Sequence, residues 1–308
     1  MKRIFAMILC AMLLMHGYAL ATVEIETIPW EELPPGSDDQ THVLLLCADK
    51  WEAKPWNLGN TDGIMLVTLD TRAHRVMLTS VTRDALVLRL DQTVGKINAV
   101  AREGSPEKLC KTLSQHLGVR IEQYILFDFQ QIADLIDRLG GVEIEVNAAE
   151  IDYLNRYAIS KTATDRPLTQ PGIYRFNGRA AVIYMRIRKA GGGGDLMRTQ
   201  RARNVFSSLA DQCRNLSYEE AGSIANGILE HNIMTSMNLE TMMKLVEKAC
   251  LLRDCTIEEL RLPPDELVHI PTDTEIFVQE VDWTACREIF LRYLEHSVLI
   301  QEAVGPGQ

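Results

Sequence analysis

Five arginines crowd around a run of four glycines in the segment 184–203, and a sixth lies just upstream. They are Arg186, Arg188, Arg198, Arg201, Arg203 and the upstream Arg179, and one aspartate, Asp195, directly follows the glycines. The whole chain has a formal net charge of -10, so this basic cluster is local. The planar guanidinium fork stays charged and matches phosphate oxygens. The segment predicts a site for a phosphorylated ligand, with pyrophosphate as the leading candidate. The alternative is a solvated basic helix face behind a flexible loop.

The spacing within this segment divides the arginines into two groups. Arg186 and Arg188 alternate, so on an extended segment both side chains face one ligand. The glycine run lets the chain turn back, and Asp195 and Arg198 then begin a helix whose N-terminus favours anions. Arg201 and Arg203 are interpreted as charges on the surface of that helix.

Further charged residues stand where predicted strands give way to loops. Asp49 follows the first strand, Asp62 precedes the second, and Asp84 follows the third. Asp49 and Asp62 could both bind one Mg²⁺, which takes one or two carboxylates together with phosphate oxygens and water. Each aspartate could instead be a turn or cap residue. Arg83 and Lys96 are cations at loop positions, either ligand-binding or simply solvated.

The elements that must position these residues follow from hydrophobic patterning. Short apolar runs predict strands at 42–47, 64–69, 76–80 and 124–127, and alternation predicts another at 142–146. Helices are expected at 106–117, where Ser105 is the N-cap and Gly118 the stop, and at 130–139, 177–184 and 198–216. Residues 147–172 look irregular. The pattern predicts an α/β fold, a central sheet flanked by helices.

Four segments divide the chain. Residues 1–21 have the basic start, apolar run and A-x-A ending of a signal peptide, with an uncleaved membrane anchor as the alternative. Residues 22–40 are a polar, Pro-containing linker, 41–216 form the α/β domain, and 217–308 form a mostly helical extension or a small second domain. Either reading of the leader places the body outside the cytoplasm, secreted or anchored at the outer face of the membrane.

Composition narrows the function classes. Apolar content of 46% and charged content of 24% are typical of a soluble globular protein. The acidic balance and the lack of a DNA-binding motif argue against nucleic acid as a partner. Six cysteines follow the leader; in an exported protein they can form disulfides or be buried as small hydrophobic residues.

Nine motifs occur in an order that resembles the LytR-CpsA-Psr (LCP) family, the cell envelope-related transcriptional attenuator domain. They are L-L-L-C-A-D, T-D-G-I-M-L-V, S-V-T-R-D, K-I-N-A, D-F at 128–129, L-G-G-V, P-G-I-Y-R-F-N-G-R-A, Y-M-R-I-R-K and D-L-M-R-T-Q-R. They cover about residues 43–203, over half the chain. The resemblance implies an extracytoplasmic domain with a mixed sheet and an apolar groove for a polyprenyl chain. It implies an enzyme, a phosphotransferase that moves an undecaprenyl-pyrophosphate-linked glycopolymer, such as teichoic acid or capsular polysaccharide, to peptidoglycan at the membrane surface.

The resemblance also assigns residue roles. Metal-binding residues are Asp49 and Asp62, with Mg²⁺ as the cofactor. Pyrophosphate-binding residues are Arg83, Lys96, Arg186, Arg188, Arg198 and Asp195. Catalytic residues are Arg83, Asp84, Arg186, Arg188 and Arg198, where Asp84 either assists deprotonation of the acceptor hydroxyl or is a structural partner of an arginine.

Two positions depart from the family pattern. Asn60 stands where the family usually has an arginine, and Ala202 where it usually has a glutamine. Lys54, Gln200 or Arg203 could substitute for the lost groups. The departures keep a second hypothesis open, a protein that binds polyprenyl (pyro)phosphate without turnover as a carrier, sensor or regulator. Direct regulation of transcription, which the family's older name suggests, does not fit an exported acidic chain.

Overall fold

The computed structural model describes residues 25–156, 167–187, 194–230, 233–272 and 276–295. The predicted leader, Arg188 and the side chain of Asp195 lie outside this described part. Within it, no helix has the length and apolar character needed to cross a bilayer.

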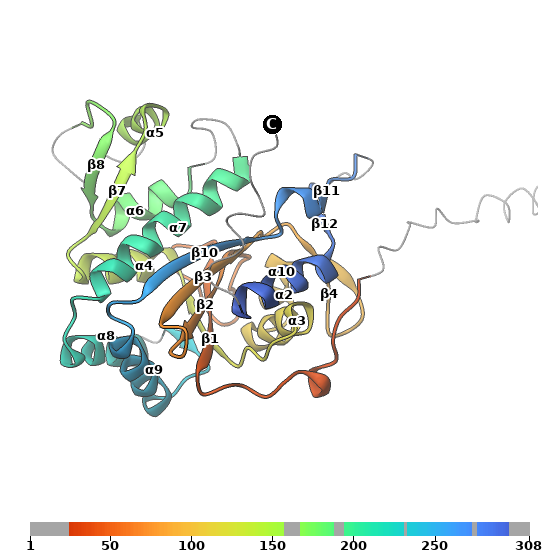
Figure 1. Cartoon of the computed structure of the whole chain (residues 1–308). Helices are drawn as coiled ribbons and strands as arrows, with labels where there is room; N and C mark the ends of the chain where they lie inside the picture. The colour runs from red at the N-terminus through yellow and green to blue at the C-terminus, as the bar shows by residue number, and fades with distance from the viewer. Residues whose placement is uncertain (1–24, 157–166, 188–193, 231–232, 273–275, 296–308) are drawn as a thin grey trace, which may run out of the picture.

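A six-stranded sheet forms the centre of the molecule, in the order β10-β3-β2-β1-β6-β9 (Figure 1). Its strands are β1 (Gln40–Ala48), β2 (Thr61–Asp70), β3 (Arg75–Val81), β6 (Gln123–Phe127), β9 (Met234–Thr235) and β10 (Thr256–Leu262). β1 pairs antiparallel with β2 and parallel with β6, while β10 pairs parallel with β3. The predicted central mixed sheet is therefore confirmed.

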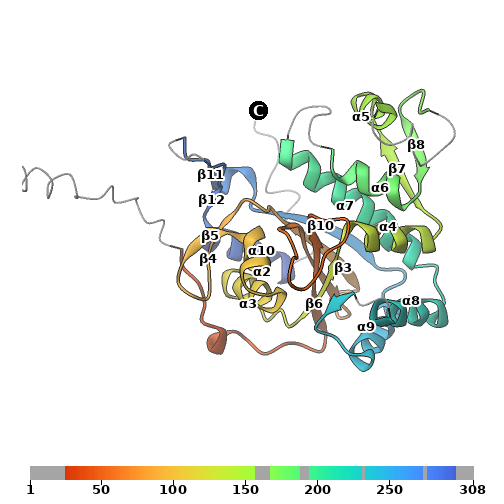
Figure 2. The ribbon, with the colours of Figure 1, turned by 180° about the vertical axis from the view of Figure 1, so that it is seen from behind.

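Helices cover both faces of the sheet (Figures 1 and 2). One face carries α2 (Val100–Glu103), α3 (Pro106–Leu117) and α10 (Trp283–Glu295). The other carries α4 (Phe129–Arg138), α6 (Gly178–Met185), α7 (Gly194–Cys213), α8 (Tyr218–Glu230) and α9 (Leu239–Leu251). A hairpin of β7 (Val142–Val146) and β8 (Gly172–Phe176) lies beside α5 (Ala148–Leu154) at the far end of the α6–α7 layer. Shorter elements are η1 (Trp30–Glu32), β4 (Leu86–Leu88), β5 (Val94–Lys96), η2 (Ile97–Ala99), η4 (Asp265–Leu267), β11 (Val268–His269) and β12 (Glu280–Val281).

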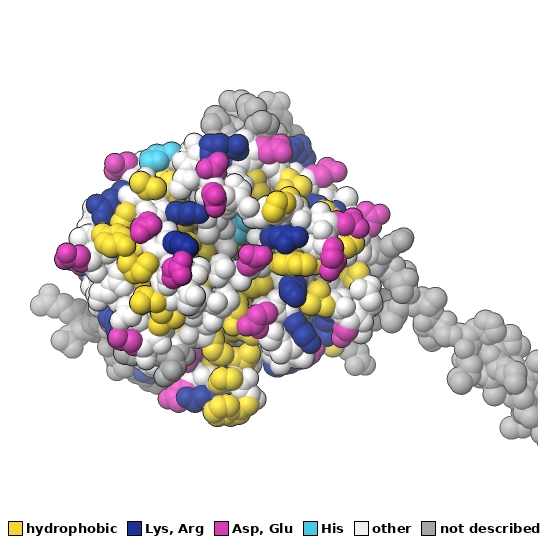
Figure 3. Space-filling model, turned by 90° about the horizontal axis from the view of Figure 1, so that it is seen from below, with side chains coloured by type: hydrophobic (Ala, Val, Ile, Leu, Met, Phe, Trp, Pro, Cys, Tyr) yellow, Lys and Arg dark blue, Asp and Glu magenta, His cyan; other side chains and the backbone are white. Residues whose placement is uncertain are grey.

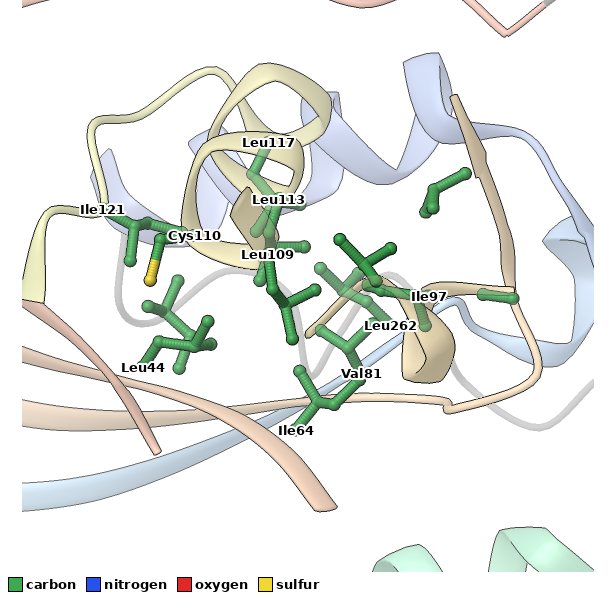
Figure 4. Packing of buried hydrophobic residues seen from close by; sticks show 14 of the residues in the cluster. Leu44, Ile64, Val81, Ile97, Leu109, Cys110, Leu113, Leu117, Ile121 and Leu262 are labelled. Atoms are coloured by element: carbon green, nitrogen blue, oxygen red, sulfur yellow. The ribbon is translucent and has the colours of Figure 1, made fainter. Parts of the chain in front are cut away.

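Side-chain alternation along the strands creates two separate cores. In β1, Leu44 and Leu46 pack with α3 in the first core, whereas Val43 and Leu45 belong to the second. Figure 4 shows the first core, where Leu109, Leu113 and other side chains of α3 lie over the sheet. The period of two in a strand decides which residues reach which layer.

Local caps explain where several helices begin and end. The Ser105 hydroxyl accepts a hydrogen bond from the Lys108 N–H, and Gly118 ends α3 with a φ of 79°. Residues 147–172 were expected to be irregular, and this prediction was wrong for α5. Asn147 and Glu150 there form a capping box, in which each side chain accepts the other's backbone N–H at 3.1 Å.

The segment after residue 216 supplies both edge strands of the sheet as well as its helices. β9 pairs with β6 at one edge and β10 pairs with β3 at the other. This segment therefore continues the same sheet. All six cysteines of the described part are free thiols.

Candidate functional site

A β-bulge places Asp62 at the end of the sheet. Cys47 of β1 pairs with Gly63, but the next residue, Ala48, pairs with Thr61, so Asp62 is left over in the ladder. A bulge of this kind redirects a side chain and is common beside active sites. A Cβ at Gly63 would lie 2.8 Å from the Cys47 Cβ, so glycine is required for this close approach.

Two arginines from distant elements converge on the Asp62 carboxylate. Arg83, which follows β3, forms an ion pair with Asp62 Oδ2, and Arg198 Nη1 in α7 lies 3.1 Å from the same oxygen. Asn98 Nδ2, from the predicted K-I-N-A motif, lies 3.5 Å from Oδ1. Asp62 and Arg198 are each only 9% exposed, so the charges interact in a partly dehydrated environment.

Asp84 and Lys96 lie one contact away from Asp62. Lys96 Nζ is 2.8 Å from Asp84 Oδ1, and Arg83 Nε is 3.4 Å from Asp84 Oδ2. Neither Asp84 nor Lys96 lines the site cavity described below. This geometry matches the structural alternative for Asp84, in which the carboxylate orients Arg83.

Asp49 and Arg186 form a second, more exposed pair. Arg186 Nη2 lies 3.7 Å from Asp49 Oδ1, and the side chains are 46% and 37% exposed. The Arg186 guanidinium also lies over the Phe129 ring, 4.4 Å from its centroid. Arg186 was expected on an extended segment, but it has helical dihedrals (φ −92°, ψ 0°) as the C-cap of α6. That prediction was wrong because the helix expected at 177–184 runs one residue further, to Met185, and Arg186 caps it.

A cavity of about 460 Å³ lies between the sheet and the layer of α4, α6 and α7, and Arg83, like Asp84 and Lys96, is absent from its lining. Asp49, Asp62, Arg186 and Arg198 line it together. The rest of the lining is mostly apolar: Leu45, Leu46, Cys47, Ile64, Met65, Val81, Phe129, Ile132, Val182, Ile183, Met185, Ala202 and Phe206, with Tyr153, Gly63 and Ser80. An apolar cavity with a few convergent polar groups is the usual form of a small-ligand site.

Three lining residues of α7 recur every four residues along one face of the helix. Arg198, Ala202 and Phe206 have this spacing, which was visible in the sequence. Ala202, noted as a departure from the family pattern, therefore lies at the cavity wall. The helical spacing could have predicted Phe206, which was missed.

Arg201 and Arg203 were expected on the helix surface, and this was wrong. Arg201 is 1% exposed, with Nε 2.7 Å from Glu150 Oε1. Arg203 is 6% exposed, with Nη1 2.5 Å from Ser80 Oγ and Nε 3.3 Å from Glu259 Oε2. Each arginine forms an ion pair with a carboxylate from another element, and this pairing compensates its charge in the buried position.

The thiol of Cys47, which lines the cavity, is unreactive. Burial raises the pKa of Cys47 far above its ordinary value, and the negative charges of Asp62 and Asp49 act in the same direction. The thiol therefore stays protonated and is no nucleophile.

Two carboxylates on one cavity wall suit Mg²⁺ as a partial ligand set. The described residues contain no cluster of three or more His, Cys, Asp or Glu side chains able to hold a metal. An ion there would need phosphate or water oxygens to complete its shell, which is how Mg²⁺ is usually bound.

One face of the molecule carries charges of both signs. On the face shown in Figure 3, acidic and basic side chains are interspersed, with hydrophobic side chains between them. A mixed surface of this kind lacks the one-sign field expected of a nucleic-acid-binding face.

Comparisons with known proteins give a consistent result. The profile of the LytR_cpsA_psr family matches residues 20–288. The polyisoprenyl-teichoic acid–peptidoglycan teichoic acid transferase TagV of Bacillus subtilis is 26% identical over 242 residues, 77% of this chain and 60% of the relative. Biofilm regulatory protein A of Streptococcus mutans is 28% identical over 167 residues, 52% of this chain and 39% of the relative. The match thus spans about 40 to 60% of the length of these curated relatives.

Solved structures share the fold. TagT bound to LIIa-WTA superposes with a TM-score of 0.68 at 19% identity, covering 87% of this chain and 96% of that one. TagT with bound octaprenyl pyrophosphate lipid gives a TM-score of 0.63 at 16% identity, covering 89% and 98%. At these identities the likeness establishes the architecture of the chain.

Proposed function

The chain belongs to the LytR-CpsA-Psr family, and on this premise we propose that it is an extracytoplasmic phosphotransferase. Its donor is a glycopolymer, such as teichoic acid or capsular polysaccharide, linked to a polyprenyl pyrophosphate, and its acceptor is peptidoglycan. One observation carries the proposal: Arg186 and Arg198 meet Asp49 and Asp62 at an apolar cavity of about 460 Å³. Cations suit the pyrophosphate, and the apolar walls suit a prenyl chain.

The chemistry needs positioning and charge stabilisation more than covalent help from the protein. An acceptor sugar hydroxyl attacks the phosphorus that carries the glycopolymer. The bond from that phosphorus to the bridging oxygen breaks, the prenyl monophosphate leaves, and the hydroxyl proton passes to solvent or to a carboxylate. Arg83, Arg186 and Arg198 stabilise the charge that develops on the phosphate oxygens.

Mg²⁺ is part of the proposal as the cofactor. Asp49 and Asp62 would hold it, and when bound it would neutralise phosphate charge. Asp62 is paired with Arg83 and Arg198 in the described structure. A metal at Asp62 would compete with both arginines for that carboxylate, and the arginines would then turn toward phosphate oxygens.

A second candidate function is binding without turnover. Ala202 lines the cavity where the family usually has glutamine, so one polar group beside the phosphates is absent. Gln200 and Arg203 do not replace it, since they bond to each other and both are absent from the lining. A carrier or sensor of polyprenyl pyrophosphate would need the cavity and the arginines but not this group.

One assay separates the two functions. Purified protein is incubated with a polyprenyl-pyrophosphate-linked glycan and peptidoglycan fragments, with and without Mg²⁺, and release of prenyl phosphate is measured. We expect Mg²⁺-dependent release that falls in Asp62→Ala. Tight donor binding with no release above that of Asp62→Ala would support the binding protein and contradict the transferase.

A further inference from the structure

Two arginines stack on a pair of aromatic rings beside the cavity. Trp51 and Phe129 meet edge to face, with centroids 5.8 Å apart. Arg186 lies over Phe129, and the guanidinium carbon of Arg179 lies 5.3 Å from the Trp51 centroid. Phe129 and Arg186 line the cavity. Trp51 and Arg179 pack beside them and continue the aromatic and cationic lining beyond the cavity. We call these four residues the stacked surface.

The backbone holds the stacked surface in place from both sides. Phe129 N–H donates to Lys50 O at 2.9 Å, and Ala53 N–H donates to the Asp128 carboxylate at 3.0 Å, which ties the Trp51 loop to the start of α4. On the other side, a Cβ at Gly178 would lie 1.9 Å from Ala133 O. Glycine there lets α6 approach α4 closely, and that approach brings Arg179 to Trp51.

A second tryptophan in the molecule shows what a purely structural stack looks like. Arg120 also lies 5.3 Å from a tryptophan centroid, that of Trp30, but its Nε donates to Leu33 O as well. Arg179 is exposed, and the described residues give it no hydrogen-bond or ion-pair partner besides the ring of Trp51. Its guanidinium donors are thus available to a ligand, unlike those of an arginine that joins two loops.

We propose that the stacked surface binds the phosphorylated sugar of the donor, immediately beyond the pyrophosphate. This rests on the proposed function, because it places the pyrophosphate at Arg186 and Arg198. The C–H face of a sugar packs on an aromatic ring such as Trp51, and the free guanidinium of Arg179 pairs with a phosphate on that sugar. The same loop also carries Trp56, which is 83% exposed and offers a second ring.

Arg179 also supplies a positive charge in a chain that has Asn60 where the family usually has an arginine. Asn60 carries no charge, and its Oδ1 is buried without a hydrogen-bond partner in the described part of the chain. In addition to Arg186 and Arg198, which line the cavity, this chain offers Arg179 of α6 over the ring of Trp51. The shift moves positive charge from the diphosphate toward the attached sugar, which favours anionic glycans over neutral ones.

Three soluble probes test this with the full-length protein in binding calorimetry. They are farnesyl diphosphate, farnesyl diphosphate carrying a hexosamine, and the same compound with a phosphate on the hexosamine. The wild type should bind the phosphosugar probe most tightly. Arg179→Ala should weaken that probe about tenfold, the loss expected for one charge-assisted hydrogen bond, and leave farnesyl diphosphate within about twofold. Trp51→Ala should weaken both sugar probes.

Arg175→Ala is the matched control, because Arg175 is an exposed arginine of β8, 61% exposed and paired with Glu143. It should leave all three affinities unchanged, and thermal melting should show that every variant is folded. Equal losses in Arg179→Ala on all three probes, or the same loss in Arg175→Ala, would overturn the inference. A wild type that binds the phosphosugar probe no better than farnesyl diphosphate would overturn it too. A wild type that fails to bind farnesyl diphosphate would instead contradict the proposed function.

Discussion

The two faces of the central sheet are built from the same strands but differ in how they are filled. On the α3 face, Leu44, Leu66 and Leu113 are fully buried in one continuous core. On the α4 face, Leu45 and Met65, which pair across β1 and β2, instead line a cavity of about 460 Å³. Protein interiors are normally close-packed, so an open volume of this size costs stability.

Alternate residues of the same strands therefore serve different purposes. Those on one face stabilise the fold, and those on the other face form the candidate site. The α3 face (the filled face) is packed as a core, whereas the α4 face (the open face) combines a core with a cavity that Asp49, Asp62, Arg186 and Arg198 line. Substitutions on the two faces should therefore separate stability from activity, and four predictions test this from the largest expected effect to the smallest.

Arg198→Ala on the open face should give the largest change, and it should be in activity. Arg198 lies 3.1 Å from Asp62 and lines the cavity. Removing one charge-stabilising donor typically lowers turnover about 100- to 1000-fold. The measurement is the rate of prenyl phosphate release, with Arg175→Ala as the control for lost positive charge. Unchanged turnover would show that the open face is not the reaction site.

Leu113→Ala removes packing from the filled face and should lower the free energy of unfolding. Leu113 is 0% exposed, and such a truncation costs about 3–4 kcal/mol in the free energy of unfolding. Ile132→Ala, which removes a side chain from the cavity wall, should cost about 1–2 kcal/mol because part of that side chain already faces open volume. Urea unfolding of both variants gives the comparison, and equal losses would contradict it.

Acid should weaken the filled face through His116. Burial lowers the pKa of His116 to about 4; the hydrogen bond with the Thr112 carbonyl opposes this shift, and the charge of Arg287 adds to it. Its Nε2 accepts the Leu88 N–H at 3.2 Å, so the native ring is neutral. Between pH 6.5 and 4 the unfolded chain takes up a proton that the native chain does not. The free energy of unfolding therefore decreases as the pH is lowered through this range.

The loss from His116 should reach about 2–3 kcal/mol near pH 4, at about 1.4 kcal/mol per pKa unit. Unfolding measured against pH should show the fall, and His116→Gln should reduce it. His74→Gln, in the exposed hairpin turn between β2 and β3, is the control that should leave the slope intact.

Ala202→Leu should produce the smallest change in stability and a selective change in binding. The larger side chain would occupy cavity volume next to Arg198, so unfolding should shift by less than about 1 kcal/mol. Binding of farnesyl diphosphate should weaken about tenfold as the prenyl chain loses space. Ala210→Leu, two turns further along α7 and absent from the lining, is the matched control. Equal binding by both variants would place the prenyl chain elsewhere.

Signals between neighbouring residues made much of the fold predictable. The apolar runs gave β1, β2, β3 and β6, and Ser105 with Gly118 gave the ends of α3, because strand burial and helix capping depend on residues close in sequence. β10 was not predicted as part of the sheet. Its sequence T-I-E-E-L-R-L mixes charged and apolar residues, as suits a strand at the sheet edge with partly solvated faces.

The site was predictable only where its residues form sequence motifs. Asp62, Arg83 and Arg198 were identified and do converge. Arg201 and Arg203 were misplaced because their burial depends on Glu150 and Glu259, which lie 51 and 56 residues away in the chain. The stacked surface was missed for the same reason, since Trp51, Phe129 and Arg179 meet only after α6 packs on α4.

The placement of β10 sets an order of events as the chain is synthesised. β10 pairs with β3 although their residues are about 180 positions apart. A chain that emerges from its N-terminus first exposes the free edge of β3 until residue 262 has followed. Such an open edge is prone to pair with another chain, so incomplete copies are expected to associate. Truncation after residue 216 should yield aggregates even though every lining residue of the cavity would still be present.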